Sequence, residues 1–402
     1  MAGTISATAL RALTAEVARH PGPKTVLVGG ATVAAARRVL DLLAPDDQLV
    51  LAAEAPDFAE RLSTELGADW DDAAGRVSVV TSLADVKGSS VDVAVAAEPL
   101  ARDAALIEDV LGAYRAVLAA DGVLSVATPF TLNGDPQALA HLVSAHAVRS
   151  ELVVRSRPPL RVHHLRFETA GTSLAERLLP VHSPSSVTVT PTMGIDSNGV
   201  AAAAILGGAA ALVKAVRPRS KAWLVPAVLA LPVAAFFRDP RRVPPLGDPG
   251  GVVAASDGVV LRVDRVEDKR FGPGEWLRIV VFLSVLDVHV NRSPVAGRVV
   301  DIIREDGGYA MAQSEAAEHN VAQYTVLETA RGRVVVAQRT GLIARRIVNR
   351  ARIGSVLARG ERYGLIRFGS RTDVYLPAAA VEPAVAPGDR VTGAQTIIAR
   401  YL

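Results

Sequence analysis

A Gly-Ser pair at residues 369 and 370 stands in RFGSRTD, a stretch near the end of the chain that otherwise has the pattern of a β-strand. Glycine in a strand often marks a bulge and serine is common in turns, so the pair alone favours a tight turn. The chemical alternative is self-cleavage of the bond between Gly369 and Ser370, a reaction in which a serine hydroxyl is the nucleophile. Which alternative holds depends on the elements that surround the pair.

The composition of the 402 residues limits the chemistry that is available. The length predicts about two or three domains. Half of the residues are hydrophobic and 21% are charged, which indicates folded domains with a local membrane-seeking segment. The absence of cysteine excludes disulfides, thiolate metal ligands and a cysteine nucleophile, and we expect no metal site. A net charge of +3 is too small to indicate nucleic acid, and residues 1–20 lack the pattern of a secretory signal peptide.

Residues 23–167 alternate short apolar runs with segments of helical periodicity, which predicts an α/β fold with a doubly wound sheet. The runs predict buried parallel strands at 25–30, 48–54, 76–82, 91–98 and 122–128. Two further predicted strands, 151–156 and 161–167, flank a Pro-Pro turn and should form an antiparallel pair at one end. A sheet that finishes in this way resembles class I S-adenosylmethionine-dependent methyltransferases, so we expect a Rossmann-like domain of this type at 1–167.

The cofactor loop departs from that family's pattern. The family usually carries an acidic residue after its first strand and then a Gly-x-Gly loop, whereas this chain has Val28 in the acidic position and keeps only Gly29 and Gly30. Glu54, at the end of the second strand, matches the ribose-binding carboxylate, although an acid at a strand end is also an ordinary loop residue. We therefore expect a degenerate domain that does not bind S-adenosylmethionine, with a working enzyme as the alternative.

Residues 168–198 are rich in Ser, Thr and Pro and read as a linker. Two apolar blocks follow at 199–213 and 222–237, each shorter than the about 20 residues that cross a bilayer upright. Basic residues stand between the blocks and after the second one (Lys214, Arg217, Arg219 and Lys221, then Arg238, Arg241 and Arg242). A single span would put one cluster on the wrong side, so 199–242 is expected to form a short helical hairpin that enters and leaves one face of an anionic membrane, or lies in its interface. The alternative is a pair of buried soluble helices, which the lack of a polar face disfavours.

From residue 236 onward the sequence carries six motifs in a fixed order. They are FFRDPRRVPP (236–245), ASDGVV (255–260), VFLSVLDVHVNRSPVAGRV (281–299), GLIARRIV (341–348), RYGLIRFGSRTDVYLP (362–377) and GDRVTGAQTIIA (388–399). Together they resemble the phosphatidylserine decarboxylase family, in the compact form whose processing site reads Gly-Ser after an aromatic residue. The resemblance implies a β-rich domain at 243–402, in agreement with the short apolar runs separated by glycine turns.

The resemblance implies that the chain cuts itself between Gly369 and Ser370. In this family the serine hydroxyl attacks the preceding carbonyl, the acyl group moves from nitrogen to oxygen, and β-elimination breaks the chain. The remnant of Ser370 loses ammonia and becomes a pyruvoyl group, a cofactor made from the chain itself. The fragments 1–369 and 370–402 are expected to remain together as a heterodimer.

By the same resemblance, His289 in DVHVNR is the base, and Asp257 in SDG is the carboxylate that orients it and stabilises the imidazolium, as in serine hydrolase triads. Asp287 is the alternative orienting acid. Longer relatives carry a second histidine three residues beyond the first, where this chain has Arg292. Whether His289 serves both self-cleavage and turnover is therefore open.

In turnover, the pyruvoyl carbonyl would form a Schiff base with the amine of phosphatidylserine and accept the electrons left when carbon dioxide departs. His289 would protonate the carbanion, and Arg345 and Arg346 would hold the phosphodiester by charge. We therefore expect a phosphatidylserine decarboxylase that makes phosphatidylethanolamine at the cytoplasmic face of the cell membrane. The alternatives are an unprocessed lipid-binding scaffold and a bifunctional enzyme whose front domain methylates a lipid amine, and a homo-oligomer is open.

Overall fold

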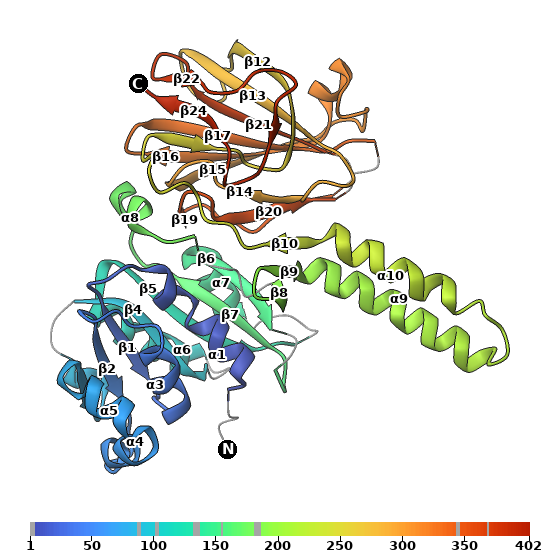
Figure 1. Ribbon diagram of the computed structural model, residues 1–402. Coiled ribbons are helices and arrows are strands. Elements are labelled where there is room, and N and C mark those ends of the chain that lie inside the picture. The colour runs from blue at the N-terminus through green and yellow to red at the C-terminus, as the bar shows by residue number, and fades with distance from the viewer. Residues whose placement is uncertain are drawn as a thin grey trace. The chain divides into compact units, whose positions relative to one another are not determined.

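The computed structural model describes residues 5–86, 90–100, 104–131, 137–153, 156–180, 186–342, 346–367 and 370–402 (Figure 1). Contacts divide the chain into two compact units. The first comprises Met1–Pro184 and Arg352–Val356, and the second comprises Ser185–Ala351 and Leu357–Leu402.

The first unit is built on a seven-stranded sheet with the order β3-β2-β1-β4-β5-β7-β6. Strands β1 to β5 are parallel, and β7 runs antiparallel between β5 and β6. The strands are β1 Thr25–Gly29, β2 Gln48–Ala52, β3 Val77–Val80, β4 Val91–Pro99, β5 Leu118–Pro129, β6 Ala147–Val153 and β7 Leu160–Leu165. The predicted doubly wound sheet and its closing antiparallel pair are confirmed.

Helices cover both faces of this sheet, because the strands are apolar on both sides. Val26 and Val28 pack into one buried cluster with residues of α1, α3 and α4, whereas Leu27 packs into a second cluster with α6 and α7. The helices are α1 Ala7–Leu13, α2 Ala15–Arg19, α3 Val33–Leu40, α4 Phe58–Leu66, α5 Ala68–Ala73, α6 Ala104–Val117 and α7 Gln137–His146, with 3-10 turns at Ala74–Arg76 and Leu83–Asp85.

The segment predicted to be a linker contains regular structure. Helix α8 (Thr172–Arg177) buries Leu174 and Ala175, and strands β8 (Ser186–Thr190) and β9 (Met193–Asp196) form an antiparallel hairpin. Strand β10 (Arg238–Pro240) extends this hairpin to a three-stranded sheet. The prediction of a segment without periodicity was wrong here, because the short alternation in VTVTPTMGID is a hairpin pattern that the Ser, Thr and Pro content obscured.

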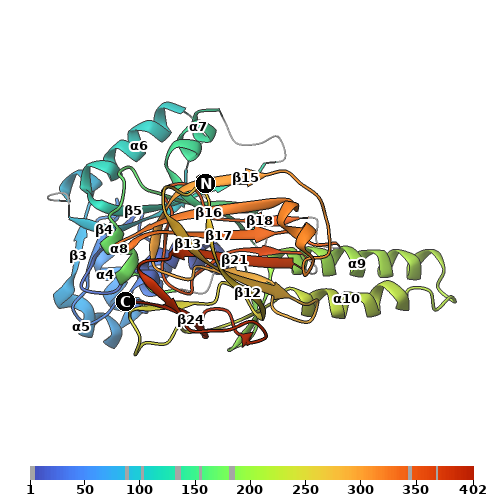
Figure 2. The same ribbon diagram turned by 90° about the horizontal axis from the view of Figure 1, so that it is seen from above.

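The two apolar blocks form an antiparallel helical hairpin, α9 (Ser197–Val216) and α10 (Leu224–Phe236), which lie side by side in Figures 1 and 2. The prediction that both helices are too short for a membrane was wrong for α9. Asp196 caps this helix by accepting a hydrogen bond of 2.9 Å from the N–H of Asn198, and the helix runs on past Lys214 to 20 residues. By length and composition α9 could span a membrane, and only 11% of its apolar 18-residue stretch is buried.

The second unit is dominated by an eight-stranded sheet, β19-β15-β16-β17-β21-β13-β12-β23, with two small sheets, β11-β24-β22 and β14-β20-β18. This agrees with the predicted β-rich domain. The strands are β11 Gly251–Val253, β12 Gly258–Glu267, β13 Glu275–Leu283, β14 Val290–Arg292, β15 Gly297–Glu305, β16 Ala322–Thr329, β17 Gly332–Arg339, β18 Ile347–Asn349, β19 Val356–Leu357, β20 Arg362–Ile366, β21 Ser370–Pro377, β22 Val381–Pro383, β23 Arg390–Val391 and β24 Ile397–Tyr401, with a 3-10 turn at Glu315–His319.

Strand β21 lies inside the large sheet, antiparallel to β13 on one side and to β17 on the other. Its side chains alternate between two environments, as a strand period of two requires. Val374 and Leu376 join the main apolar cluster, whereas Tyr375 joins an aromatic cluster with Phe271 and Tyr324. The residue that begins this strand is Ser370.

Candidate active site

Ser370 is fully buried at the start of β21, where it pairs with Leu283 of β13. Its hydroxyl oxygen is buried and has no hydrogen-bond partner in the part of the chain that the structure describes. A buried hydroxyl without a partner costs free energy, which a sequence tolerates where the group has a chemical role. Gly369, the other half of the predicted cleavage site, lies outside the described residues.

His289 directly precedes β14 and lies beside the last residue of β20, because the N–H of Ile366 donates a 3.2 Å hydrogen bond to the carbonyl of His289. Its ring is buried against Phe236, the last residue of α10, with ring centroids 4.2 Å apart. The catalytic histidine predicted from the sequence therefore lies at the base of the apolar hairpin.

The protonation state of His289 follows from its main-chain contact. Its Nδ1 lies 2.9 Å from the carbonyl oxygen of Asp287, and since a carbonyl only accepts, Nδ1 carries the proton. Nε2 is then the ring nitrogen that carries the lone pair. Burial lowers the pKa of His289 to about 4, against the raising effects of the Asp287 hydrogen bond and charge. His289 is therefore a neutral imidazole near pH 7, the form that a general base requires.

Neither predicted orienting carboxylate contacts the imidazole. The carboxylate of Asp257 accepts hydrogen bonds from Arg242, at 2.8 Å for Nη2, and from the N–H of Gly393 at 2.9 Å. The carboxylate of Asp287 accepts from Ser284 and Arg390. The expected triad contact is corrected accordingly, because the main-chain carbonyl of Asp287 orients the ring, and Asp257 acts on it only through charge, which raises the pKa of His289.

Arg292, which stands where longer relatives have a histidine, is held in a buried ion cluster. Its Nη2 lies 3.4 Å from the buried carboxylate of Asp239 and donates to the carbonyl of Pro240 at 2.8 Å. Asp239 also accepts from Arg362 at 2.6 Å and from Ser186 at 2.7 Å. This ion cluster ties strand β10 to the small sheet that holds β14 and β20.

Sequence reasoning missed a buried ion cluster that begins one residue after Ser370. Arg371 and Asp373 are both fully buried and contact each other at 2.6 Å and 2.8 Å, and Arg339 of β17 lies 3.0 Å from Asp373. Burial alone would raise the pKa of Asp373, but the charges of Arg371 and Arg339 hold it at about 2. The sequence signal for this cluster was the pair of opposite charges at Arg371 and Asp373, two residues apart in SRTD. The cluster fixes the register of β21 and thus the position of Ser370.

Of the two arginines predicted to bind the phosphodiester, Arg345 lies outside the described residues, whereas Arg346 is exposed just before β18. The carbonyl of Arg346 accepts a 3.2 Å hydrogen bond from the N–H of Arg367, the residue that follows β20. Arg346 is thus brought to the end of the strand that leads to Ser370.

The predicted cofactor residues of the front unit meet at the carboxyl edge of its sheet, since Gly29 pairs with Ala52 and Glu54 follows two residues later, exposed. The chain's own side chains account for both glycines. A Cβ on Gly29 would lie 1.9 Å from the hydroxyl of Tyr114, and one on Gly30, whose φ is +61°, would lie 2.8 Å from Glu98. The residues present therefore do not call for S-adenosylmethionine.

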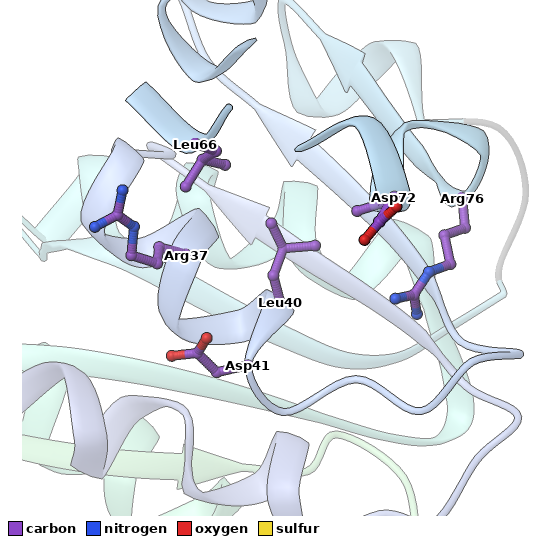
Figure 3. A pocket seen from close by; sticks show the side chains of 7 residues that line it. Arg37, Leu40, Asp41, Leu66, Asp72 and Arg76 are labelled. Atoms are coloured by element: carbon purple, nitrogen blue, oxygen red, sulfur yellow. The ribbon is translucent and has the colours of Figure 1, made fainter. Parts of the chain in front are cut away.

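A hollow of about 210 Å³ in the front unit is lined by both acidic and basic side chains (Figure 3). It lies between the C-terminal end of α3, with Leu40 and Asp41, and Arg76 just before β3. Ligands of doubly wound sheets bind at the carboxyl ends of the strands, whereas this hollow is at the amino ends. It is therefore not the predicted cofactor site.

Solved structures similar to the chain include methyltransferases. A precorrin-6y C5,15-methyltransferase from Geobacter metallireducens is 18% identical with a TM-score of 0.30, covering 39% of this chain and 86% of its own. An S-adenosylmethionine-dependent O-methyltransferase from Thermotoga maritima is 14% identical with a TM-score of 0.29, covering 40% and 64%. The fold of the front unit rests on its strand order and not on these likenesses.

The family model described as phosphatidylserine decarboxylase matches residues 229–399, which include Asp257, His289 and Ser370. Several relatives are named phosphatidylserine decarboxylase proenzyme. That of Geotalea uraniireducens is 47% identical over 183 residues, 44% of this chain and 84% of the relative. The proteins of Symbiobacterium thermophilum and Nocardia farcinica are 49% and 44% identical, with 84% and 81% of the relative covered. This chain belongs to the phosphatidylserine decarboxylase family.

Proposed function

We propose that the chain is a pyruvoyl-dependent enzyme that decarboxylates phosphatidylserine to phosphatidylethanolamine after cutting itself between Gly369 and Ser370. The observation that carries the proposal is the buried hydroxyl of Ser370 at the start of a central strand, which has no hydrogen-bond partner among the described residues, in a chain whose relatives are named proenzymes. Release of radiolabelled carbon dioxide from carboxyl-labelled phosphatidylserine tests the activity. An unprocessed scaffold would release none.

Self-cleavage needs only atoms of this chain and water. The oxygen of Ser370 bonds to the carbonyl carbon of residue 369, the C–N bond breaks, and an ester replaces the amide. Loss of the Ser370 α-proton then expels the carboxylate of residue 369 and leaves a dehydroalanine, whose imine form is hydrolysed to the ketone with release of ammonia. The ketone supplies an electron sink for the carbanion that decarboxylation leaves.

We assign the role of base to His289. Its Nε2 would take the hydroxyl proton of Ser370, because Nδ1 is committed to the carbonyl of Asp287. The charge of Asp257, itself held by Arg242, would stabilise the imidazolium that forms. In turnover, the same Nε2 is the proton donor proposed for the carbanion.

We expect the rate of self-cleavage to stay constant from neutral pH down to about pH 5 and to fall as the pH passes 4, since burial lowers the pKa of His289 to about 4 and only the neutral ring accepts a proton. The measurement is the half-time of cleavage of newly synthesised chain at each pH, with circular dichroism to exclude acid unfolding. A decline centred near pH 6.5, the ordinary value for histidine, would contradict a buried base.

We propose that the hairpin α9–α10 attaches the enzyme to an anionic membrane. Its outward side chains are apolar, with Ile205, Leu212 and Leu231 each more than 60% exposed. The hairpin carries the basic cluster of Lys214, Arg217, Arg219 and Lys221 at its far end, between α9 and α10. Placing these cations at the centre of a bilayer would cost about 2.5–3.5 kcal/mol each, so a tip-first re-entrant hairpin is disfavoured. If the hairpin instead lies in the membrane interface, both basic clusters stay at the level of the headgroups.

Single cysteines test this arrangement cleanly, because the chain has none of its own. With protein bound to the outside of phosphatidylglycerol vesicles, we expect an impermeant maleimide to label Ser220→Cys at the tip and Glu382→Cys on β22 alike. Leu212→Cys in α9 should be labelled only without vesicles, since the acyl chains would cover it. Protection of Ser220→Cys would indicate a tip that enters or crosses the bilayer, and labelling of Leu212→Cys on vesicles would show that the hairpin does not insert.

We propose that the fragments 1–369 and 370–402 remain associated and that the front domain does not use S-adenosylmethionine. The first proposal is supported by the position of β21, which is paired along both edges with strands of the longer fragment. The second is supported by Tyr114 and Glu98, which fill the space beside Gly29 and Gly30.

A further inference from the structure

Three arginines without a carboxylate partner surround the base of the hairpin in the second unit. Arg238 donates to the main-chain carbonyls of Ala235 and Leu286. Arg367 donates to the side-chain oxygen of Asn198 at 2.6 Å, and its buried Nε has no partner among the described residues. Arg346 is exposed, and no described residue forms a side-chain hydrogen bond or ion pair with it.

The fully or nearly fully buried arginines of the same unit differ from these three. Arg292, Arg339 and Arg371 each contact an aspartate, as buried guanidinium groups require. The fully buried arginines of this domain are thus paired with aspartates, whereas the three at the base of the hairpin are not.

The unpaired charges act on one another and on the catalytic histidine. Burial lowers the pKa of Arg367, and the charge of Arg346 lowers it further. The charge of Arg238 helps to lower the pKa of His289. The acid that partly offsets Arg367 is Asp196, but its carboxylate is already bonded to Arg350 at 2.6 Å and 2.8 Å. Clustered cations without a counter-charge destabilise one another unless an anion binds between them.

Arg367 links the end of α10 to the segment that leads to Ser370. The guanidinium of Arg367 lies 5.9 Å from the ring of Phe237, next to the end of α10, while Phe236 stacks on His289. Arg367 precedes Ser370 by three residues, so their Cα atoms are at most about 11 Å apart. A lipid entering along the hairpin would bring its headgroup to these residues.

We propose that Arg367, with Arg346 and Arg238, binds the phosphodiester of the lipid headgroup, an inference that rests on the proposed function. A guanidinium matches phosphate oxygens with paired hydrogen bonds. The headgroup of phosphatidylserine has a second anion, the carboxylate, but an ion pair to that group would stabilise the ground state and be lost as carbon dioxide leaves. The phosphodiester keeps its charge throughout the reaction, so it is the anion that a fixed cationic site can bind before and after carbon dioxide leaves.

The test compares phosphatidylserine with a long-chain alkyl ester of serine, which has the amine and carboxylate but no phosphate, in detergent micelles. For Arg367→Gln and Arg346→Gln we expect kcat/KM for phosphatidylserine to fall about 10- to 100-fold, mainly through KM, because a charged hydrogen bond is lost. Turnover of the alkyl ester should change less than about threefold on the same reasoning. The matched control is Arg265→Gln on β12, whose side chain is 61% exposed and pairs with Glu275.

The outcomes separate this inference from the proposed function. If wild-type chain turns over neither substrate, the decarboxylase proposal fails. If wild type is active and the arginine variants lose both substrates equally, or neither, the phosphodiester assignment is wrong. Should Arg367→Gln fail to cut itself, as intact mass would reveal, Arg346→Gln decides, because it is farther along the chain from the scissile bond. Inorganic phosphate added to the alkyl-ester reaction distinguishes a lipid site from a general anion site, since millimolar inhibition of wild type but not of Arg367→Gln would indicate the latter.

Discussion

Replacing Ser370 with alanine is expected to leave the chain uncut and without decarboxylase activity, while the fold is retained. The substitution removes the only atom that can attack the carbonyl of residue 369 and the oxygen through which the chain would be broken. Because the hydroxyl has no hydrogen-bond partner among the described residues, its loss breaks no hydrogen bond to them and removes a buried polar group. Thermal unfolding of the variant should therefore begin no lower than that of an uncut wild-type chain.

Ser293→Ala is the matched control for this prediction. Ser293 is also fully buried, but its hydroxyl donates a 2.7 Å hydrogen bond to the carbonyl of Val295. This variant should lose about 1 kcal/mol of the free energy of unfolding and still cut itself. Two chains in a preparation of Ser370→Ala would mean that another residue supplies the nucleophile.

Replacing His289 with glutamine is expected to slow self-cleavage by about 10²- to 10⁴-fold, the usual contribution of a general base. Glutamine keeps a donor that can reach the Asp287 carbonyl but offers no basic nitrogen at the position of Nε2. The half-time of cleavage, followed by gel electrophoresis of newly synthesised chain, measures the effect. His319→Gln, at an exposed site in the 3-10 turn Glu315–His319, should cleave at the wild-type rate.

Asp287→Asn examines how the ring is oriented in the same assay. This variant keeps the main-chain carbonyl that accepts from Nδ1, so we expect a rate within about tenfold of wild type, since only the contacts of its carboxylate are lost. A loss as large as that of His289→Gln would show that the carboxylate, and not the carbonyl, positions the base. A wild-type rate for His289→Gln would remove His289 from the mechanism.

The sequence was most informative where a local pattern determines structure. The apolar runs of the front sheet are buried on both faces, so their alternation with helices predicted the strands and the antiparallel pair β6–β7. The six motifs of the second half were sufficient to place Ser370 in a β-rich domain of the correct family. In both cases the signal lies within a few residues of the feature that it predicts.

Features that depend on contacts between distant segments were missed. Arg242 and Asp257 meet because a loop folds back on the turn before β12, and neither residue type specifies that partner. The ion cluster of Arg371, Asp373 and Arg339 joins two strands whose charges would read as solvent-exposed from sequence alone. The length of α9 was missed for a local reason, because a cap at Asp196 starts the helix and the helix continues past Lys214, a residue at which hydropathy alone ends the apolar block.

The mass of the purified wild-type chain tests the central claim most directly. We predict two polypeptides, residues 1–369 with a free carboxylate and residues 370–402 lighter than the corresponding serine peptide by the mass of one ammonia. The smaller chain should resist stepwise degradation from its N-terminus, because a ketone replaces the amine, and should react with a hydrazine. A single polypeptide of 402 residues with Ser370 intact would contradict the account.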